Sequence, residues 1–281
     1  MDIVTVAGGR ALNTIKKIFN IDELFLPQAT HPVAEYRATP PKRGINIMKL
    51  KANLHLHSGE DRQDVLEYSI YQAIDRARAL GFEVLAWTPH NDVLCEKKHI
   101  EYAAQKNILL LPGVEKKVCG REVLIINADK EAEKIKNFSD LKKYKEKKGD
   151  NVLLIAPHPF FPALSALRKK LLENLRLFEV LEKSWFYLPD IDFNEKTAKI
   201  AKENILPFIA TSDTHDLQDL NNSYCVIEAE KNIPSVLAAV RTGQFENFSR
   251  PTTWPTIFRF FYKIVFHPKV LWVKFLRKIG K

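Results

Sequence analysis

Cysteine is scarce in this sequence, and long apolar runs are absent from its first residues. The 281 residues include three cysteines, Cys95, Cys119 and Cys225, which lie far apart and form no Cys-x-x-Cys pair. An odd number of scattered cysteines argues against a disulfide framework and favours a reducing, cytoplasmic location. The opening residues MDIVTVAGGR begin with an acid and build no apolar core behind a basic flank, so we expect no secretory signal.

Acidic residues are missing from the last part of the chain. No Asp or Glu follows Glu246. Eight basic residues do follow it: Arg250, Arg259, Lys263, Lys269, Lys274, Arg277, Lys278 and Lys281. Removing these eight from the 43 Lys and Arg leaves 35, against 34 Asp and Glu, so eight of the nine formal net positive charges belong to a basic tail over residues 248–281.

The tail is rich in aromatic residues, yet no apolar stretch in it approaches the roughly 20 residues needed to span a bilayer. Its cations alternate with Trp254, Phe258, Phe260, Phe261, Tyr262, Phe266, Trp272 and Phe275. Three interpretations stay open, and we favour them in this order. The tail packs as a helix on the rest of the protein; residues 254–281 form an amphipathic helix pair, broken at Pro268, on an anionic membrane surface; or the tail contacts nucleic acid.

Between an N-terminal extension (1–48) and the tail, apolar strands alternate with amphipathic helices. The extension contains a predicted helix over 11–19 and a linker over 37–44 that includes Pro-Pro. Predicted strands cover 46–57, 82–90, 108–115, 121–128, 151–159, 177–182, 206–215 and 223–229. Predicted helices cover 65–81, 99–107, 129–148, 163–176, 195–204 and 233–243. This alternation predicts an α/β domain over 49–247 with a mostly parallel sheet, open or closed into a barrel.

Polar residues that can bind metals follow the predicted strands. Five of the eight histidines stand there, together with two acids: His55, His57, His90, His158, His215, Glu115 and Asp213. The carboxyl ends of parallel strands lie at one rim, so groups at these ends converge. One strand-end histidine is more often a packed or exposed side chain than a ligand, and only the recurrence favours a site. The other three histidines, His31, His99 and His267, are interpreted as structural.

The residue types point to a metal-dependent hydrolase. Side chains alternate along a strand, so His55 and His57 project to one side, as do Asp213 and His215. Imidazole nitrogen with carboxylate oxygen suits Zn²⁺, Mn²⁺ or Fe, and no nearby cysteine suggests a thiolate zinc site. The donors exceed what one ion needs, so we expect two or three divalent ions, with Glu115 as a bridge. Two such ions about 4 Å apart can activate a water and stabilise a leaving oxygen.

The ordered motifs NLHLHSGED, GFEVLAWTPHND, LLPGVE, IAPHPF and IATSDTHD resemble the polymerase and histidinol phosphatase (PHP) family of metal-dependent phosphoesterases. The resemblance covers about residues 49 to 247. It implies a distorted (β/α)7 barrel, similar to a TIM barrel, with metals at the carboxyl rim and hydrolysis of phosphate esters. The catalytic residues that it implies are Glu115, Asp213 and His215.

The resemblance also implies a ligand set. His55 and His57 would bind the first metal with Glu115 and Asp213, and His158 would bind a second metal with Glu115. His90 and His215 would bind a third metal or the shared edge.

Three departures from the family pattern favour a two-metal site over a full three-metal site. The segment SGEDRQD stands where relatives carry Ser-Asp-Gly, so Glu60, Asp61 or Asp64 supplies the acidic ligand, and we favour Asp61. The motif Thr-Pro-His, ending at His90, lacks an acid that relatives carry. The strand after Glu115 offers only GREVLII where many relatives place a histidine.

The substrate cannot be named from these motifs. A small phosphorylated metabolite or a nucleotide suits the chemistry, and the length favours a stand-alone hydrolase over a polymerase subunit. Lys117 and Arg121 are candidates to bind the substrate phosphate, as are Lys116 and Lys183, although a solvated charged loop is the more common role of such residues. Two alternatives stay open: a metal-dependent hydrolase of another bond, such as an amide, and a non-catalytic module that binds a phosphorylated ligand and is recruited to a membrane by its tail.

Overall fold

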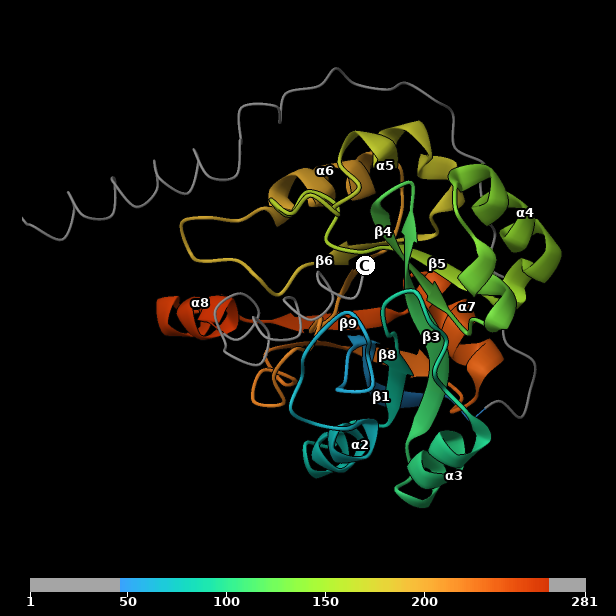
Figure 1. Cartoon of the computed structure of the whole chain (residues 1–281), viewed down its shortest axis with the longest axis vertical. Helices are drawn as coiled ribbons and strands as arrows, with labels where there is room; N and C mark the ends of the chain where they lie inside the picture. Colours follow the sequence, from blue (N-terminus) through green and yellow to red (C-terminus); the bar gives the residue numbers. More distant parts are fainter. Residues whose placement is uncertain (1–45, 263–281) are drawn as a thin grey trace, which may run out of the picture.

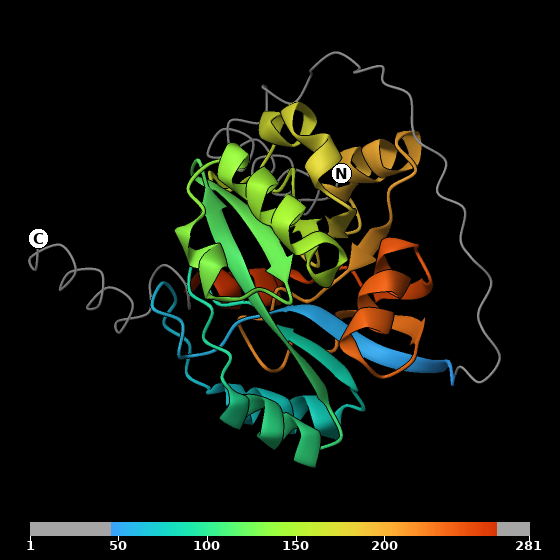
Figure 2. The same ribbon diagram turned by 90° about the vertical axis from the view of Figure 1, so that its right-hand side faces the viewer.

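Nine strands of the described part of the chain form one strongly curved sheet (Figures 1 and 2). The computed structural model describes residues 46–262, so the predicted helix over 11–19, the linker over 37–44 and Pro268 lie outside it. The strands are β1 (Met48–Leu56), β2 (Val84–Trp87), β3 (Leu109–Val118), β4 (Arg121–Ile126), β5 (Leu153–Ala156), β6 (Val180–Lys183), β7 (Phe208–Ala210), β8 (Ser223–Ala229) and β9 (Phe245–Ser249). Their order in the sheet is β7-β6-β5-β4-β3-β2-β1-β8-β9.

Most strands of the sheet run in one direction. The strands β1, β2 and β3 pair in parallel, and so do β5, β6 and β7, whereas β4 and β8 run against both of their neighbours. The predicted α/β barrel is therefore confirmed. The regular count of seven strand-helix units is not, because β3 and β4 follow each other directly as an antiparallel pair. The strand β9 crosses the predicted boundary at residue 247, and the division of the chain into three parts stays a prediction.

A side chain closes the barrel between β7 and β9. The backbone N–H of Ala210 donates to Asn247 Oδ1 at 2.7 Å, and Asn247 Nδ2 donates to the carbonyl of Phe208 at 2.7 Å. Beyond the end of β7, Thr214 forms an isolated parallel bridge with Leu56 of β1. These contacts bring the carboxyl ends of β1 and β7 together, which positions residues after β7 beside the His55–His57 pair.

Helices cover the outside of the curved sheet (Figure 1). They are α2 (Ile70–Ala79), α3 (Lys97–Gln105), α4 (Phe138–Lys148), α5 (Lys169–Glu173), α6 (Asn194–Glu203), α7 (Ile233–Arg241) and α8 (Trp254–Phe261), with short 3₁₀ helices η2 (Lys130–Lys134), η3 (Gly149–Asn151) and η4 (Leu175–Leu177). Ser69 begins α2 with a capping box, in which its hydroxyl accepts from Gln72 N while the Gln72 side chain accepts from Ser69 N.

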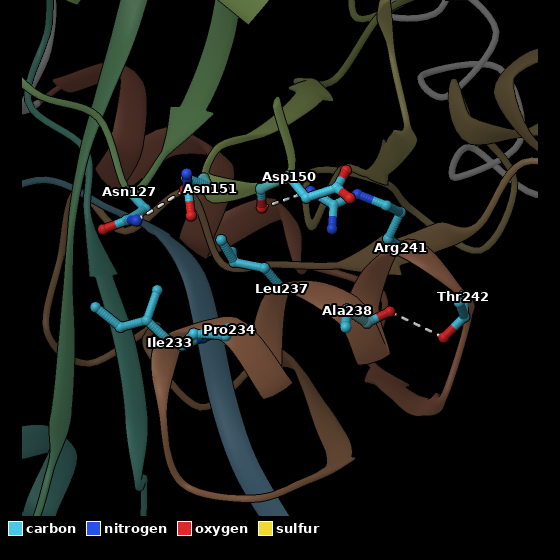
Figure 3. A pocket seen from close by; sticks show the side chains of 9 residues that line it. All are labelled: Asn127, Asp150, Asn151, Ile233, Pro234, Leu237, Ala238, Arg241 and Thr242. Atoms are coloured by element: carbon cyan, nitrogen blue, oxygen red, sulfur yellow. Dashed lines mark hydrogen bonds between the residues drawn. The ribbon is translucent and has the colours of Figure 1, made fainter. Parts of the chain in front are cut away.

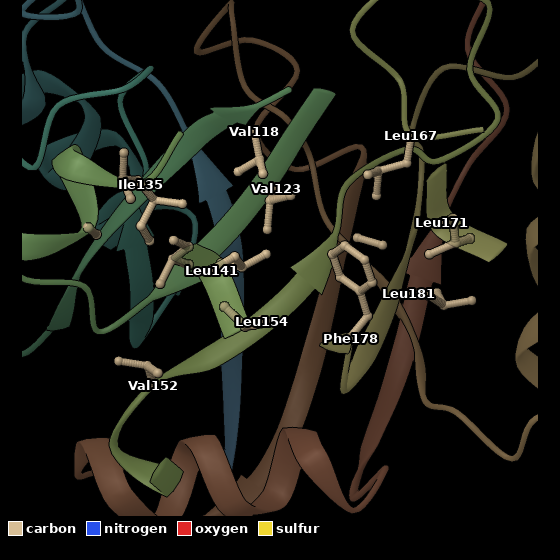
Figure 4. Close-up of a cluster of buried hydrophobic side chains, with 14 of the residues drawn as sticks. Val118, Val123, Ile135, Leu141, Val152, Leu154, Leu167, Leu171, Phe178 and Leu181 are labelled. Atoms are coloured by element: carbon tan, nitrogen blue, oxygen red, sulfur yellow. The ribbon is translucent and has the colours of Figure 1, made fainter. Parts of the chain in front are cut away.

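Three buried apolar clusters hold these layers together. One cluster packs α2 and α3 on β1 to β3 and includes Ile74, Trp87 and Ala103. A second packs α4, α5 and α6 on β3 to β6, and Figure 4 shows its side chains from Val118 to Leu181. The third fills the barrel interior with residues from β1 to β8, among them Leu50, Val84, Leu124, Ile155, Val180 and Ile209, and with Val236, Leu237 and Val240 of α7. Burial of this many branched side chains supplies most of the driving force for folding.

One predicted helix is largely wrong. Residues 163–176 form only the short helices α5 and η4. Arg168 precedes α5 with φ of 48°, a conformation that cannot continue a helix, and its N–H donates to the carbonyl of Pro159 at 2.8 Å. Arg121 donates to the carbonyls of Leu164 and Ala166. These long-range contacts fold the segment back over the end of β5 and override its helical periodicity.

The first part of the tail packs on the barrel through one helix, α8. Ile257 is buried, and Phe260 is half-buried against residues of the barrel rim, whereas Trp254 and Phe258 are 42% and 69% exposed. The packed-helix interpretation therefore applies to the described part of the tail, although one aromatic face of α8 stays in solvent. Within residues 46–262, no helix combines the length and the apolar character that crossing a membrane requires.

Candidate metal centre

Glu115 lies at the centre of the histidine cluster that the sequence predicts. It points into the barrel from β3, opposite Leu124 of the interior, and is 2% exposed. Four imidazole Nε2 atoms surround its carboxylate: Oε2 lies 3.5 Å from His55, 3.4 Å from His57 and 2.9 Å from His90, and Oε1 lies 3.4 Å from His158. Residues far apart in the sequence thus converge on one carboxylate, as the strand-end pattern predicts.

The pair after β7 completes the cluster on its more open side. Asp213 Oδ1 lies 3.3 Å from Nε2 of both His55 and His57, while His215 Nε2 lies 3.0 Å from Asp64 Oδ2. The His55 and His57 side chains are fully buried, but those of Asp213 and His215 are 18% and 12% exposed. A ligand therefore reaches the cluster from the Asp213 side.

Two residues of the cluster have an unusual backbone conformation. His158 has φ of 26° and Asp213 has φ of 43°. Positive φ is costly for residues other than glycine, and such strain gathers at functional sites. Here it turns the chain at the ends of β5 and β7, so that both side chains face the cluster.

The acidic residues that follow His57 have two different roles. Asp61 Oδ2 lies 2.8 Å from His90 Nδ1 and 3.4 Å from His57 Nδ1, and Asp64 Oδ2 contacts His215. Glu60 instead accepts from Ile70 N at the start of α2, at 3.1 Å from each oxygen. The structure thus brings Asp61 and Asp64 into the cluster and leaves Glu60 outside.

Gly59 makes this compressed turn sterically possible. A Cβ atom on Gly59 would lie 2.7 Å from the carbonyl oxygen of Leu66 and 2.9 Å from that of Tyr68. The N–H of Gly59 donates to the Tyr68 carbonyl at 2.6 Å, and this hydrogen bond joins the beginning of the loop to its end. Only glycine permits so close an approach.

The sequence analysis passed over Glu182, a fully buried acid of β6, although it ends the predicted strand 177–182. Glu182 Oε1 lies 2.8 Å from His55 Nδ1, and Oε2 accepts from the N–H of His158 at 2.7 Å. Thr211 also donates to Glu182. A carboxylate on Nδ1 fixes the tautomer of His55 and leaves its Nε2 lone pair toward the cluster, as in many metal sites. Side chains two residues apart on a strand point to the same face, so Glu182 shares the inward face with Val180 of the barrel interior. This spacing could have identified Glu182 from the sequence.

Glu122 is a second acid that the sequence analysis did not select. It stands on β4 in the segment GREVLII, where relatives often carry a histidine, and it shares the inward face with Leu124. A Glu122 oxygen lies within 4.8 Å of ligand atoms of His90 and Glu115. Burial and the nearby Glu115 raise the pKa of Glu122. The site therefore has the Glu122 carboxylate on the strand in which, by the family resemblance, this sequence lacks a histidine.

The donors of the cluster fit divalent cations. Within residues 46–262, three groups could each hold an ion, with ligand atoms within 4.8 Å of one another: His57, Asp61, Asp64 and His90; His55, His57 and Asp213; and His90, Glu115 and Glu122. The oxygen Glu115 Oε1 is buried without a hydrogen bond. In the same range, Asp61, Asp64, Glu115 and Asp213 form ion pairs with histidines and with no Lys or Arg, and Asp61 also accepts from the backbone N–H of Gln63. Excess negative charge and imidazole donors suit Zn²⁺, Mn²⁺ or Fe²⁺.

The carboxylates raise the pKa of the histidines beside them. Burial alone lowers the pKa of His158, but Glu115 and Asp213 outweigh it and raise the pKa to about 9. Burial likewise opposes the effect of Asp213 and Asp64 on His215, whose pKa rises to about 9. Burial raises the pKa of Glu115, yet the histidine charges hold it well below its ordinary value. The cluster therefore stabilises positive charge, whether protons or metal ions supply it.

The predicted phosphate-binding cations lie around the site with other partners. Lys117 Nζ donates to Gln63 Oε1 at 3.1 Å, close to the loop of Asp61 and Asp64. Arg121 donates to backbone carbonyls of the segment after β5, so its guanidinium orders that segment. Lys116 donates to the Glu133 carbonyl at 2.8 Å, and Lys183 lies over the Tyr187 ring.

His99 behaves as the structural residue that the sequence predicts. Its Nδ1 accepts from Glu96 N at 3.0 Å at the start of α3, and its ring packs on Trp87. His31 and His267 lie outside the described residues.

Fold and site together define an α/β barrel protein with a metal-binding cluster at the carboxyl rim. Residues 192–245, which include Asp213 and His215, match a family model described as PHP-associated, PHP_C. A search of curated proteins found no match.

Solved structures share the fold. PsfC from Pseudomonas syringae PB-5123 is 15% identical, with a TM-score of 0.54 over 73% of this chain and 93% of that chain. The lesion-specific endonuclease PfuEndoQ from Pyrococcus furiosus is 14% identical, with a TM-score of 0.53 over 71% of this chain and 58% of that chain. The family match thus concerns residues 192–245, and the two solved structures show that the chain shares their fold.

Proposed function

We propose that this protein is a metal-dependent phosphoesterase that hydrolyses a phosphomonoester or a nucleotide-type phosphoester by attack of a metal-activated water. The observation that carries the proposal is the position of Glu115, a buried carboxylate in contact with four histidines from β1 and from the segments after β2 and β5. The PHP-associated match over residues 192–245 supports a phosphoester as the substrate.

Two or three divalent ions are the proposed cofactors. His55, His57 and Asp213 would hold one ion, Glu115 and His158 would hold a second, and Asp61, Asp64, His90 and His215 would hold a third. Bound ions supply a nucleophilic water at neutral pH and offset the charge of the leaving oxygen.

The chain itself orients these donors. Glu182 holds the ring of His55, and Asp61 holds the ring of His90. Asp213 and His215 stand at the open edge, where they would orient the attacking water and the phosphoester.

Metal analysis coupled to a phosphoester screen tests this proposal. The full chain is purified, its bound metals are measured, and hydrolysis of phosphomonoesters and nucleotides is followed with Mn²⁺, Zn²⁺ or Fe²⁺. We expect at least one bound ion per chain and hydrolysis of part of the panel. The Glu115→Gln variant should lower kcat/KM about 10³-fold, whereas Glu101→Gln, an exposed control on α3, should not change it. A protein that binds no metal and is inactive with every ion would refute the proposal.

Two other substrates belong in the same screen. The barrel is similar to that of a lesion-specific endonuclease, which motivates single-stranded and double-stranded oligonucleotides as phosphodiester substrates. Amide substrates cover the hydrolase alternative, because metals at a barrel rim also serve that reaction. Activity on amides alone would replace the phosphoesterase proposal. Binding of phosphorylated ligands without any turnover would instead favour the non-catalytic module.

An anionic membrane surface stays a proposed partner of the tail. Trp254, Phe258 and Tyr262 are 42%, 69% and 54% exposed, at a spacing of four residues on and just after α8. Such a face suits the membrane interface, with basic residues toward anionic lipid. Sedimentation with anionic and neutral vesicles tests it, and equal binding of the full chain and the Trp254→Ala/Phe258→Ala variant would argue against it.

A further inference from the structure

Arg259 of α8 bridges two acids of the loop that follows β7. Its Nη2 atom lies 2.8 Å from both carboxylate oxygens of Asp219, and its Nε atom lies 3.3 Å from Asp216 Oδ2. Asp216 directly follows His215, whose Nε2 contacts Asp64 in the histidine cluster. The guanidinium therefore joins the tail helix to the segment that carries a proposed metal ligand.

The loop over residues 211–222 depends on such contacts because little of it belongs to the sheet. It follows β7, a strand of three residues. Before His215, the loop is held at Thr214, which forms the bridge with Leu56 and whose carbonyl accepts from the Tyr68 hydroxyl at 2.9 Å. After His215, the loop is held by the ion pairs of Arg259 and by the buried side chain of Leu220. The position of His215 thus depends on contacts on both sides of it.

The two acids that Arg259 bridges are largely buried. The side chains of Asp216 and Asp219 are 13% and 12% exposed. Removing the partner of a charge that is so little exposed is costly, because the charge is left without water and without a counter-ion. Without the guanidinium, we expect the loop to move until both carboxylates reach solvent.

The negative charge of the cluster adds to this effect. Burial raises the pKa of the Tyr68 phenol, and three nearby carboxylates raise it further: Asp216, Asp64 and Asp213. These acids therefore lie around one buried group. Repulsion among them would drive the loop away from the cluster if Arg259 did not neutralise part of their charge.

The beginning of α8 is held by contacts that do not involve the guanidinium. The hydroxyl of Thr253 caps the helix by accepting from Thr256 N. Just before the helix, Thr252 N–H donates to the Tyr187 carbonyl at 2.7 Å, and Arg250 N–H donates to the Asn222 carbonyl at 3.1 Å. A substitution of the Arg259 side chain therefore leaves the anchors of the helix in place.

The residue after Arg259 contacts the ring of His215 itself. The edge of one ring faces the other, with the centroids of Phe260 and His215 5.7 Å apart and their planes at 83°. On its other sides, His215 Nδ1 donates to the Asp213 carbonyl at 2.9 Å, and Nε2 lies 3.0 Å from Asp64 Oδ2. The helix and the loop together thus set the direction of the imidazole.

We propose that Arg259 is a positioning residue of the metal centre. By bridging Asp216 and Asp219, it holds the loop after β7 in the conformation that directs His215 Nε2 into the cluster. The inference rests on the proposed phosphoesterase function, since it concerns a ligand of the proposed ions. Arg259 acts through His215 and does not itself bind an ion.

The Co²⁺ affinity of the full chain tests this role without any substrate. Chelator-treated protein is titrated with Co²⁺ against a chromophoric chelator, and the visible absorption of bound Co²⁺ reports the geometry of its ligands. We expect Arg259→Ala to lower the affinity for at least one ion about tenfold and to change the spectrum, because His215 is displaced. Arg250→Ala removes an exposed guanidinium of the same tail and should change neither.

Arg259→Lys separates geometry from charge. The ammonium keeps the positive charge but cannot contact both acids as the planar guanidinium does, so this variant should resemble Arg259→Ala. Asp219→Asn should lower Co²⁺ affinity in the same direction, and Arg259→Ala should then cost less in the Asp219→Asn background than in the wild type. Thermal midpoints check that every variant is folded at the temperature of the titration, which separates the positioning role from a general loss of stability.

The outcomes distinguish this proposal from the phosphoesterase proposal. A Co²⁺ affinity of Arg259→Ala or Arg259→Lys within threefold of the wild type overturns the positioning role, with or without hydrolysis of an ester. In an active enzyme, Arg259→Ala should also lower kcat about tenfold at saturating Co²⁺, with KM within threefold. An unchanged kcat would overturn the role of Arg259 while the phosphoesterase stands. A wild-type chain that binds no Co²⁺ would overturn both proposals.

Discussion

The charged side chains at the two ends of the barrel are neutralised by their neighbours to different degrees. At the amino end, Arg241 of α7 borders a cavity of about 190 Å³ together with Asn127, Asp150 and Asn151 (Figure 3). Arg241 pairs with Glu179 at 2.5 Å and donates to the carbonyls of Asp150 and Val152. The charge of Arg241 is therefore neutralised by Glu179, and its hydrogen bonds to the two carbonyls join α7 to the segment before β5.

At the carboxyl end, compensation is incomplete. The carboxylates gather around imidazoles, Glu115 Oε1 has no hydrogen bond, and both His158 and Asp213 are in a strained conformation. At the amino end, the ion pair between Arg241 and Glu179 stabilises the barrel. At the carboxyl end, the negative charge of the carboxylates is neutralised only when a further cation binds. In barrels of this type, the same division separates stability from function.

Asp213→Asn should give the largest effect on function. The change removes one negative charge from the open edge of the cluster, so we expect kcat/KM to fall about 10³-fold and the metal content to decrease. The free energy of unfolding without metal should also fall near neutral pH, because the Asp213 carboxylate raises the pKa of His158 and His215 and so stabilises their charge in the folded state. Steady-state kinetics and metal analysis measure both. Retention of more than a tenth of the activity would assign Asp213 no part in the reaction.

Glu182→Gln should act on the cluster without touching the substrate. The amide can still accept from His158 N, but it holds the His55 ring less firmly, so we expect metal affinity to fall about 10-fold to 100-fold. Titration of chelator-treated protein with Zn²⁺ or Mn²⁺ measures this. Glu179→Gln is the matched control at the amino end and should leave metal affinity within twofold. An equal loss in both variants would remove the distinction between the two ends.

Arg241→Ala should produce the opposite pattern. It breaks the ion pair with Glu179 and two hydrogen bonds to backbone carbonyls, so we expect a loss of about 2 kcal/mol in the free energy of unfolding. Lys147→Ala, at an exposed ion pair with Glu131, should lose less than about 0.5 kcal/mol. Urea unfolding measures both, and kcat/KM of Arg241→Ala should stay within twofold of the wild type. A strong loss of activity with intact stability would contradict our interpretation of this end.

The smallest effect that we expect is the pH dependence of the free energy of unfolding of the metal-free protein. The Glu115, Asp213 and Asp64 carboxylates raise the pKa of His158 and of His215 to about 9 in the folded protein, above the ordinary value of 6.5, so each contributes stability that is complete below pH 6.5. This contribution is lost as pH rises through about 9. Chelator-treated protein should therefore have a lower free energy of unfolding at pH 9.5 than at pH 6, and His215→Gln should reduce the difference. A stability that rises over this interval would be inconsistent with the charge pattern described above.

The sequence was a good guide to local features of the site and a weaker one to long-range features. Strand-end histidines, Glu115 and Asp213 could be selected because strands alternate with helices and their carboxyl ends share a rim. Glu122 and Glu182 could have been found by the same alternation, since each is two residues from an interior aliphatic side chain. Glu122 lies inside its predicted strand and not at the end of it, whereas Glu182 ends the predicted strand 177–182 and was not selected.

Other features could not be read from local pattern. Positive φ at His158, Arg168 and Asp213 is uncommon for any residue other than glycine, although Asp and His adopt it more often than most, so tertiary contacts decide where it occurs. The helical periodicity over 163–176 yields to hydrogen bonds from Arg121, a residue of another strand. The contact of Phe260 with His215 depends on where α8 docks, which no periodicity in the tail specifies.

The closure of the barrel through Asn247 links metal retention to folding. The amide of this one side chain joins β7 to β9, and Thr214 joins the end of β7 to β1. The proposed ligands His55 and His57 lie on one side of this seam, and Asp213 lies on the other. An ion held between them would cross-link the two sides of this junction, so opening of the barrel wall would require release of the ion, and the free metal concentration would set how often the wall opens.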